Sequence, residues 1–264
     1  MNEPWEHPDW YDLHDTTWTA GPEREPEHYR ETVLVLPPLD RDDHLVDVGA
    51  GTGKLALLVA RAYPRLGHVT LIEPNIQKLE RAEARLREAL PGSRVVTLGA
   101  ALGEGHALPK AEATLVTAGS VLMPTMELRG GTLEVGRRWL RAALAEIRDM
   151  LRPGAGFFDI DTLATPWARG GASDPVRRLA FRELVEELER TGFRPVDCVY
   201  RFRDRVVLRA GRISAPNTAG STPRFLAAPS SCGNALVPSS SRNMMRPAWC
   251  RPRPWPRSIP RATS

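Results

Sequence analysis

The feature that most constrains the fold is a glycine-rich turn, Gly49-Ala50-Gly51-Thr52-Gly53, between a predicted strand and a predicted helix. Residues 45–48 before it have the apolar composition of a buried strand, and residues 54–63 after it have helical spacing. Alternate glycines let the backbone adopt positive φ and approach a ligand closely. The N-terminus of the following helix favours negative charge. The turn therefore predicts a ligand-binding strand–turn–helix unit.

This unit begins a regular alternation of strands and helices. Strands are predicted at residues 45–48, 68–72, 94–98, 113–117, 156–162, 194–202 and 204–210. Helices are predicted at residues 27–36, 54–63, 76–90, 132–151 and 174–191. Such alternation indicates βαβ units and a parallel sheet, whereas the short junction Arg203-Asp204 allows a final hairpin. We therefore predict an α/β fold with a Rossmann-like, doubly wound sheet of seven strands, mostly parallel with one antiparallel strand in a C-terminal hairpin.

Composition divides the chain into three parts. Residues 1–30 are rich in Trp, Tyr, His and Pro without a clear period, and we predict a separate N-terminal segment there, followed by the α/β domain at residues 31–212. Residues 213–264 hold nine prolines, nine serines and seven arginines, with no Lys, Asp or Glu. We predict that this tail is disordered, because it has too little apolar surface to offset the entropy of ordering. The net charge of +4 belongs to the tail, since residues 1–212 carry about −3.

Three interpretations of the tail stay open. It could be a nonspecific nucleic-acid arm, because arginines contact phosphates and the interleaved Trp249 and Trp255 can stack on bases. It could be a flexible extension without function. It could also be the product of a shifted reading frame, which would explain the loss of every acidic residue and lysine. The last two interpretations together are favoured.

An acidic residue at the end of the second predicted strand narrows the choice of ligand. Glu73 lies 20 residues after Gly53, where a carboxylate would accept hydrogen bonds from two ribose hydroxyls. A nicotinamide or flavin dinucleotide site would have the spacing GxGxxG, but this turn reads GxGxG, with Lys54 at the third dinucleotide position. A turn that serves only strand–helix packing is the other alternative, and Glu73 argues against it.

Four segments resemble the motifs of class I S-adenosylmethionine-dependent methyltransferases, and the resemblance covers about residues 30–211. The segments are Val46-Asp47-Val48-Gly49-Ala50-Gly51-Thr52-Gly53, Ile72-Glu73-Pro74-Asn75, Leu151-Arg152-Pro153-Gly154 and Thr191-Gly192-Phe193. The resemblance implies S-adenosylmethionine as the cofactor. Two places depart from the family pattern, because the loop after the third strand offers no carboxylate to the adenine amino group and Thr114 replaces a frequent Asp.

The resemblance also implies roles for individual residues. Asp47 would meet the methionine amino group, often through water, although a helix cap or turn role is the alternative. The glycine turn would line the methionine and ribose portions, Glu73 would bind the ribose diol, and Pro74 would pack on adenine. The predicted cofactor-binding residues are Asp47, Gly49, Ala50, Gly51, Gly53, Glu73, Pro74, Ala100, Ala101 and Ala118.

The sequence predicts the residues of the methyl-acceptor site less specifically than those of the cofactor site. The reason is that in-line displacement at a sulfonium depends mainly on proximity and alignment of the reactants. The resemblance implies that the segment before the first strand forms a lid, and the aromatic-rich residues 1–30 are the predicted lid segment. The candidate acceptor-side or catalytic residues in it are Tyr11, His28 and Tyr29. The tryptophans of this segment could instead simply cover the edge of the core. Residues 117–124 lack the (N/D)PP(Y/F) motif of enzymes that methylate flat amines. The other histidines, at positions 7, 14, 44, 68 and 106, are predicted at the surface or in turns, and no spacing predicts a metal site.

We therefore predict an S-adenosylmethionine-dependent methyltransferase that acts on an O, N or C nucleophile of a small molecule. The alternatives are a protein or RNA methyltransferase and a cofactor-binding regulator without transferase activity. Nucleic acid is predicted as a partner only through the basic tail. The chain has no predicted membrane span and no signal peptide, so we expect a cytoplasmic protein without a membrane partner.

Overall fold

The computed structural model describes residues 7–9, 12, 27–128, 132–163, 178–202 and 205–213. All of them belong to the first of the two units into which the chain divides, Met1–Ala227. Most of the predicted N-terminal segment and almost the whole predicted tail lie outside the described residues, so both remain predictions.

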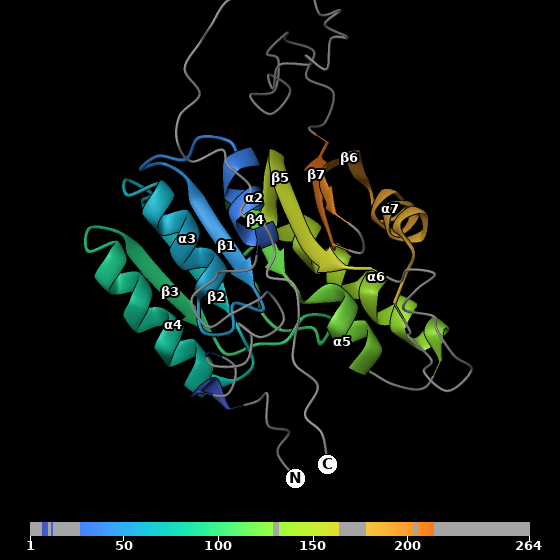
Figure 1. The fold of residues 1–264 in the computed structure, drawn as a ribbon, viewed down its shortest axis with the longest axis horizontal. Helices are drawn as coiled ribbons and strands as arrows, with labels where there is room; N and C mark the ends of the chain where they lie inside the picture. The colour runs from blue at the N-terminus through green and yellow to red at the C-terminus, as the bar shows by residue number, and fades with distance from the viewer. Residues whose placement is uncertain are drawn as a thin grey trace, which may run out of the picture. The chain divides into compact units, whose positions relative to one another are not determined.

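A seven-stranded sheet forms the centre of the described part, with the strand order β3-β2-β1-β4-β5-β7-β6 (Figure 1). β7 runs antiparallel to both of its neighbours, whereas the pairs from β3 to β5 are parallel. The predicted Rossmann-like sheet is thereby confirmed. The strands are β1 His44–Val48, β2 His68–Ile72, β3 Arg94–Leu98, β4 Ala113–Gly119, β5 Leu151–Thr162, β6 Phe193–Phe202 and β7 Arg205–Arg212.

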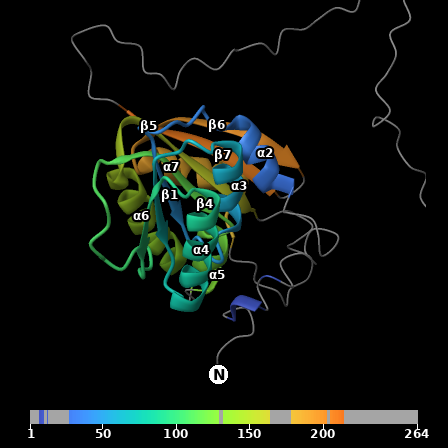
Figure 2. The same ribbon diagram turned by 90° about the vertical axis from the view of Figure 1, so that its left-hand side faces the viewer.

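Helices cover both faces of the sheet, so the strands β1, β2 and β4 are buried along almost their whole length. Side chains of α2, α3 and α4 pack in one core cluster, and those of α5, α6 and α7 pack in the other. Figure 2 shows α6 on one side of the strands and α2 and α3 on the other. The helices are α2 Glu27–Val35, α3 Lys54–Ala62, α4 Ile76–Ala89, α5 Leu122–Leu128, α6 Leu133–Met150 and α7 Phe181–Arg190.

Many element boundaries differ from the sequence-based prediction by one or two residues, and those of β5 and α7 differ by more. β4 continues to Gly119, two residues beyond its predicted end, and β5 begins at Leu151 rather than at 156 because Leu151 pairs with Ala113 across an irregular register. The helix predicted at residues 174–191 includes residues 178–180, which are not helical, and α7 begins at Phe181, whereas residues 174–177 lie outside the described residues. The start of α7 is set by Glu183, whose Oε2 accepts a hydrogen bond from the Ala180 N–H at 2.8 Å. The predicted junction of β6 and β7 lies outside the described residues.

A charged cluster holds α7 against α6. The Glu187 carboxylate of α7 is fully buried and accepts hydrogen bonds from Arg137 at 3.0 Å and from Arg141 at 2.7 and 3.0 Å. Arg137 also pairs with Glu183. Two guanidinium groups of one helix thus compensate a single buried charge of the other.

Two histidines predicted in surface or turn positions begin neighbouring strands instead. His44 is only 5% exposed, and its ring stacks on that of His68 with centroids 3.7 Å apart. His44 Nε2 lies 2.8 Å from the Thr70 hydroxyl. Burial is the main cause that lowers the pKa of His44 to about 4, so its ring is neutral at pH 7. Pairing of β1 with β2, which single-residue patterns do not reveal, brings these rings together.

Candidate functional site

The glycine turn has the backbone geometry that its sequence requires. Gly49, Gly51 and Gly53 have φ values of 61°, 54° and 82°, in the left-handed region where a side chain would be strained. A Cβ at Gly49 would also overlap the Val121 side chain, and one at Gly53 would lie 2.9 Å from the Cβ of Ala82. Glycine is therefore needed both for the turn and for the close approach of the elements around it.

Glu73 supports the turn from the end of β2. Its side chain is 8% exposed, and Oε2 accepts a hydrogen bond from the Gly51 N–H at 3.0 Å while Oε1 accepts one from the Asn75 N–H at 3.1 Å. Each carboxylate oxygen has two lone pairs, so both keep acceptor capacity for a ligand. The carboxylate is thus positioned by backbone groups on either side.

A cavity of about 290 Å³ lies at the carboxyl ends of β1, β2 and β4, the edge of a doubly wound sheet where ligands bind. Its volume is close to the lower limit of roughly 300 Å³ for small-molecule sites. Its lining residues are Val48, Gly49, Gly51, Ile72, Glu73, Pro74, Lys78, Ala100, Ala101, Leu102, Gly119, Ser120, Val121, Pro124, Thr125 and Trp139.

The β4 side of this cavity depends on α5, a helix that the sequence analysis missed. The buried Asp161 carboxylate of β5 caps α5, accepting a hydrogen bond from the Met123 N–H at 2.9 Å. Ser120 just before α5 has a φ of 57°, uncommon outside glycine, and its N–H donates to the Ile160 carbonyl at 2.6 Å. α5 is short, contains Pro124 and lacks a local cap signal, so a distant carboxylate stabilises it.

An aromatic side chain from α6 completes the cavity and was also missed. Trp139 is 9% exposed, and its Nε1–H donates to the Leu102 carbonyl at 2.9 Å. Glu146 lies two turns after Trp139 on the same face of α6. It accepts hydrogen bonds from the N–H groups of Gly103 at 2.6 Å and Gly105 at 3.2 Å. These contacts hold the loop after β3 against α6. The sequence analysis predicted only a helix at residues 132–151, and nothing in the spacing of that segment indicates a cavity.

Asp47 lies beside the main cavity rather than in it. It lines a second cavity of about 10 Å³, the size that holds one water molecule, and Gly49 and Gly119 line both cavities. The Thr117 hydroxyl donates to Asp47 Oδ1 at 2.7 Å. Burial is the largest cause that raises the pKa of Asp47 to about 7, and the Glu73 charge adds to it, whereas the hydrogen bonds from Thr117 and the Ala56 backbone act in the opposite direction.

The predicted cofactor residues fall into three groups. Six line the main cavity, namely Gly49, Gly51, Glu73, Pro74, Ala100 and Ala101. Asp47 and Ala50 line the small cavity. Gly53 and Ala118 line neither, because Gly53 packs against α4 and Ala118 is buried within β4.

Of the three predicted acceptor-side residues, only Tyr29 has a side chain in the described part of the structure. The buried Tyr29 hydroxyl donates to the Gly119 carbonyl at 3.0 Å and lines the small cavity. His28 belongs to α2, but its side chain lies outside the description, as does the whole of Tyr11. Tyr29 therefore has a structural partner beside the site.

A second buried carboxyl group lies two residues before Asp161 on β5. Neither side-chain oxygen of Asp159 has a hydrogen-bond partner among the described residues, and the residue is fully buried. Burial, with a contribution from the nearby Asp161 charge, raises the pKa of Asp159 well above its ordinary value. The same burial raises the pKa of Asp161 to about 6. The neutral form of Asp159 is thus favoured.

The described residues contain no cluster of three or more His, Cys, Asp or Glu side chains that could hold a metal ion. They also contain no helix that is long and apolar enough to cross a membrane.

Comparison with known proteins identifies relatives of this fold. No protein-family model matches the chain. Ribosomal RNA small subunit methyltransferase G of Hyphomonas neptunium is 34% identical over 127 residues, which cover 46% of this chain and 55% of that protein. The chain thus spans just over half the length of the curated relative that it matches.

Solved structures share the fold at low sequence identity. The CurJ carbon methyltransferase superposes with a TM-score of 0.58 at 15% identity, covering 81% of this chain and 62% of that one. The 4+2 cyclase SpnF superposes with a TM-score of 0.55 at 18% identity, covering 78% and 95%. These likenesses concern the fold. The chain is thus similar in fold to methyltransferases of known structure, and over 127 residues it is similar in sequence to a ribosomal RNA methyltransferase.

Proposed function

We propose that this protein transfers a methyl group from S-adenosylmethionine to an O, N or C nucleophile of a small molecule. The observation that carries the proposal is the cavity at the carboxyl ends of β1, β2 and β4, which is lined by both the glycine turn and Glu73. The glycines leave the backbone accessible, and Glu73 offers a carboxylate of fixed orientation. These are the groups that a nucleoside with an amino-acid arm requires.

The residues present fit this cofactor. Glu73 would accept hydrogen bonds from the ribose hydroxyls, Pro74 and Ala100 would contact the adenine, and Gly49 and Gly51 would face the amino-acid arm. Asp47 is separated from the main cavity by a space for one water, which fits a water-mediated contact with the cofactor amino group. When bound, S-adenosylmethionine supplies a methyl group on a sulfonium that is already a good leaving group.

The chain's own contribution to catalysis would be alignment of the two reactants and exclusion of water. The only titratable side chains among the described lining residues are Glu73 and Lys78, and Glu73 is assigned to the cofactor. Holding reactants in line can contribute about 7–11 kcal/mol to the lowering of a barrier. An acceptor that is already nucleophilic would therefore need no general base.

The β4 side of the cavity favours a small acceptor with an apolar body. Val121, Pro124, Leu102 and Trp139 provide apolar surface there, and Ser120 and Thr125 add only hydroxyl groups. The small volume and the net charge of about −3 over residues 1–212 point the same way, since RNA binding needs positive charge along the phosphates.

An RNA acceptor is the second candidate, because the curated relative in sequence is a ribosomal RNA methyltransferase. Calorimetric titration with S-adenosylmethionine tests the cofactor first, and we expect a single saturable site. Transfer of a radiolabelled methyl group is then measured with a panel of small O, N and C nucleophiles and, separately, with small-subunit ribosomal RNA. Labelling of the RNA alone would contradict the small-molecule proposal, and the absence of any binding heat would contradict both candidates. Binding without transfer to any acceptor would favour a regulator.

Cofactor affinity is expected to rise with pH between about 5.5 and 7. Asp47 is protonated below its pKa of about 7, and a nearby ammonium group favours the ionised form. Below pH 7, cofactor binding must therefore release one proton from Asp47. Release of one proton lowers the affinity by up to about tenfold for each unit by which the pH falls. Calorimetry with S-adenosylhomocysteine in buffers of different ionisation enthalpy measures the proton release.

Two controls isolate the Asp47 effect. The Asp47→Asn variant should bind more weakly and lose the pH dependence. Methylthioadenosine, which lacks the amino-acid arm, should bind the unaltered protein equally at pH 5.5 and 7. A pH profile that is identical for the variant and the unaltered protein would show that Asp47 does not meet the amino group.

A further inference from the structure

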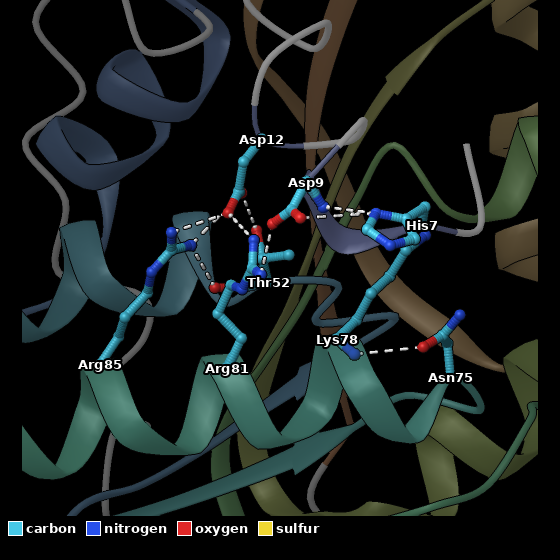
Figure 3. Close-up of polar contacts among 8 residues, drawn as sticks. All are labelled: His7, Asp9, Asp12, Thr52, Asn75, Lys78, Arg81 and Arg85. Carbon is cyan, nitrogen blue, oxygen red and sulfur yellow. Dashed lines mark hydrogen bonds and ion pairs between the residues drawn. The ribbon is translucent and has the colours of Figure 1, made fainter. Parts of the chain in front are cut away.

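Thr52 of the glycine turn is bound from outside the cavity by a residue near the N-terminus. The Thr52 hydroxyl donates to Asp12 Oδ1 at 2.6 Å, and the Thr52 carbonyl accepts a hydrogen bond from Arg85 Nη1 at 2.8 Å. Arg85 Nη2 in turn donates to Asp12 Oδ2 at 2.8 Å. Figure 3 shows Asp12 above Thr52, with Arg85 of α4 reaching both the Asp12 carboxylate and the Thr52 carbonyl. The three residues form a closed ring of polar contacts around one residue of the turn.

A second arginine of α4 strengthens the attachment. Arg81 donates to Asp12 Oδ2 at 2.9 Å and to Asp9 Oδ1 at 2.6 Å (Figure 3). Arg81 and Arg85 lie four residues apart, so both reach Asp12 from one face of the helix. The Asp12 carboxylate thus has one hydroxyl and two guanidinium donors, gathered from the turn and from α4.

The Asp12 cluster (Asp12, Thr52, Arg81 and Arg85) is shielded more than an ordinary surface pair. The Asp12 side chain is 18% exposed, Thr52 is fully buried, and both arginines are about one third exposed. Burial acts to raise the pKa of Asp12, but hydrogen bonds from Arg85, Thr52 and Arg81 outweigh it and lower the pKa. By contrast, the Arg87–Glu83 pair on the same helix has an arginine that is 58% exposed and no contact with the turn.

The contacts of the turn determine what Asp12 controls. Gly51 and Gly53, on either side of Thr52, hold the turn through bonds from the Gly51 N–H to Glu73 and from the Gly53 N–H to the Ala50 carbonyl. Gly49 and Gly51 line the main cavity, whereas Thr52 does not. Contacts of Thr52 with Asp12 and Arg85 therefore constrain the backbone of the turn from outside the cavity, while Gly49 and Gly51 of the same turn line the cavity.

We propose that Asp12 is a positioning residue for the cofactor site, which acts through Thr52 on the glycine turn and makes cofactor affinity depend on ionic strength. The proposal rests on the proposed function, since the ligand of the turn is taken to be S-adenosylmethionine. Salt dependence follows because the arginine pairs of Asp12 are partly exposed to solvent, where dissolved ions weaken the attraction between charges. The Debye length falls from about 30 Å at 0.01 M salt to about 10 Å at 0.1 M.

The test uses the full-length protein and four variants. Asp12→Asn removes the charge at nearly constant shape, and Thr52→Val removes only the hydroxyl that links Asp12 to the turn. Thr52→Ser restores that hydroxyl, and Arg87→Gln is the matched control that removes an α4 arginine outside the Asp12 cluster. Amide hydrogen exchange of residues 49–53 is measured without ligand, and the Kd of S-adenosylhomocysteine is measured at several salt concentrations.

We expect Asp12→Asn and Thr52→Val to speed exchange in the turn and to raise the Kd by about fivefold to tenfold. The salt dependence of the Kd should be lost in Asp12→Asn, whereas Thr52→Ser and Arg87→Gln should resemble the unaltered protein. Unchanged exchange and affinity in Asp12→Asn would overturn the proposal, as would equal effects of Arg87→Gln. If Asp12→Asn does not fold, the comparison of Thr52→Val with Thr52→Ser decides. Failure of the unaltered protein to bind S-adenosylhomocysteine would count against the proposed function, and exchange in the ligand-free turn would still test the role of Asp12.

Discussion

Replacing Glu73 with alanine is expected to weaken S-adenosylmethionine binding by about 100- to 1000-fold. A hydrogen bond to a charged acceptor contributes about 1.5–3 kcal/mol, so two bonds from ribose hydroxyls, each near the lower end of this range, would give about 3–4 kcal/mol. The same carboxylate holds the N–H groups of Gly51 and Asn75, so its loss also releases the turn that lines the cavity. Both effects act in the same direction. Isothermal titration calorimetry of the variant measures the change directly.

Two variants place this result in context. Glu73→Gln keeps one acceptor oxygen and should fall between alanine and the unaltered protein. Glu112→Gln changes an exposed carboxylate just before β4, at the opposite edge of the sheet, and should leave the affinity unchanged. An alanine variant that binds within about threefold of the unaltered protein would remove Glu73 from the cofactor site.

Replacing Glu187 with alanine is expected to lower the free energy of unfolding by about 3–5 kcal/mol. The carboxylate is fully buried between α6 and α7, and its removal leaves the guanidinium groups of Arg137 and Arg141 without their main partner. Because 1 kcal/mol shifts the Tm of a domain of this size by roughly 2–4 °C, the melting temperature should fall by about 6–20 °C. Urea unfolding followed by circular dichroism gives the free energy.

An exposed pair on the same helix supplies the control. Glu186 pairs with Arg182, whose side chain is 91% exposed, so Glu186→Ala should cost less than about 0.5 kcal/mol. The pH dependence of the stability that Glu187 contributes is a second, independent test of the buried ion pair. Hydrogen bonds from Arg141 are the largest cause that lowers the pKa of Glu187 in the folded protein. The stability that Glu187 contributes is therefore fully present above its pKa in the unfolded chain, and it is lost as the pH falls through its pKa in the folded protein. The difference between the unaltered protein and Glu187→Ala should therefore shrink in acid, and equal losses for Glu186 and Glu187 would contradict a buried ion pair.

Local signals were sufficient for most of the fold. β2 and β3 have the bounds that their apolar, β-branched runs predict, and α4 begins where expected because the Asn75 side chain accepts the Lys78 N–H at 3.1 Å. The helix before β6 was predicted to include residues 178–180, which are not helical, and residues 174–177 of the prediction lie outside the described residues. α5 was missed because its N-terminus is capped by Asp161 from another strand.

The glycine turn and Glu73 were predictable because their chemistry is local. Positive φ requires glycine at the positions where it occurs, and a strand of known length places the acidic residue at its end. The remaining walls of the cavity come from residues that are distant in sequence. Trp139 belongs to α6 and Leu102 to the loop after β3, and these two segments meet only through tertiary packing. The spacing of apolar residues in a helix does not show whether a side chain lines a cavity or packs in the filled core.

By itself, the sequence determined the order of strands and helices, the backbone of the turn and the carboxylate beside it. Only the tertiary structure decided that Asp47 opens on a separate one-water cavity and that Asp12 is bonded to Thr52, 40 residues away. The physical reason is that backbone preferences and hydrophobic periods act over a few neighbouring residues. Burial, pKa shifts and ion pairs depend instead on which distant side chains the folded sheet brings within a few ångströms.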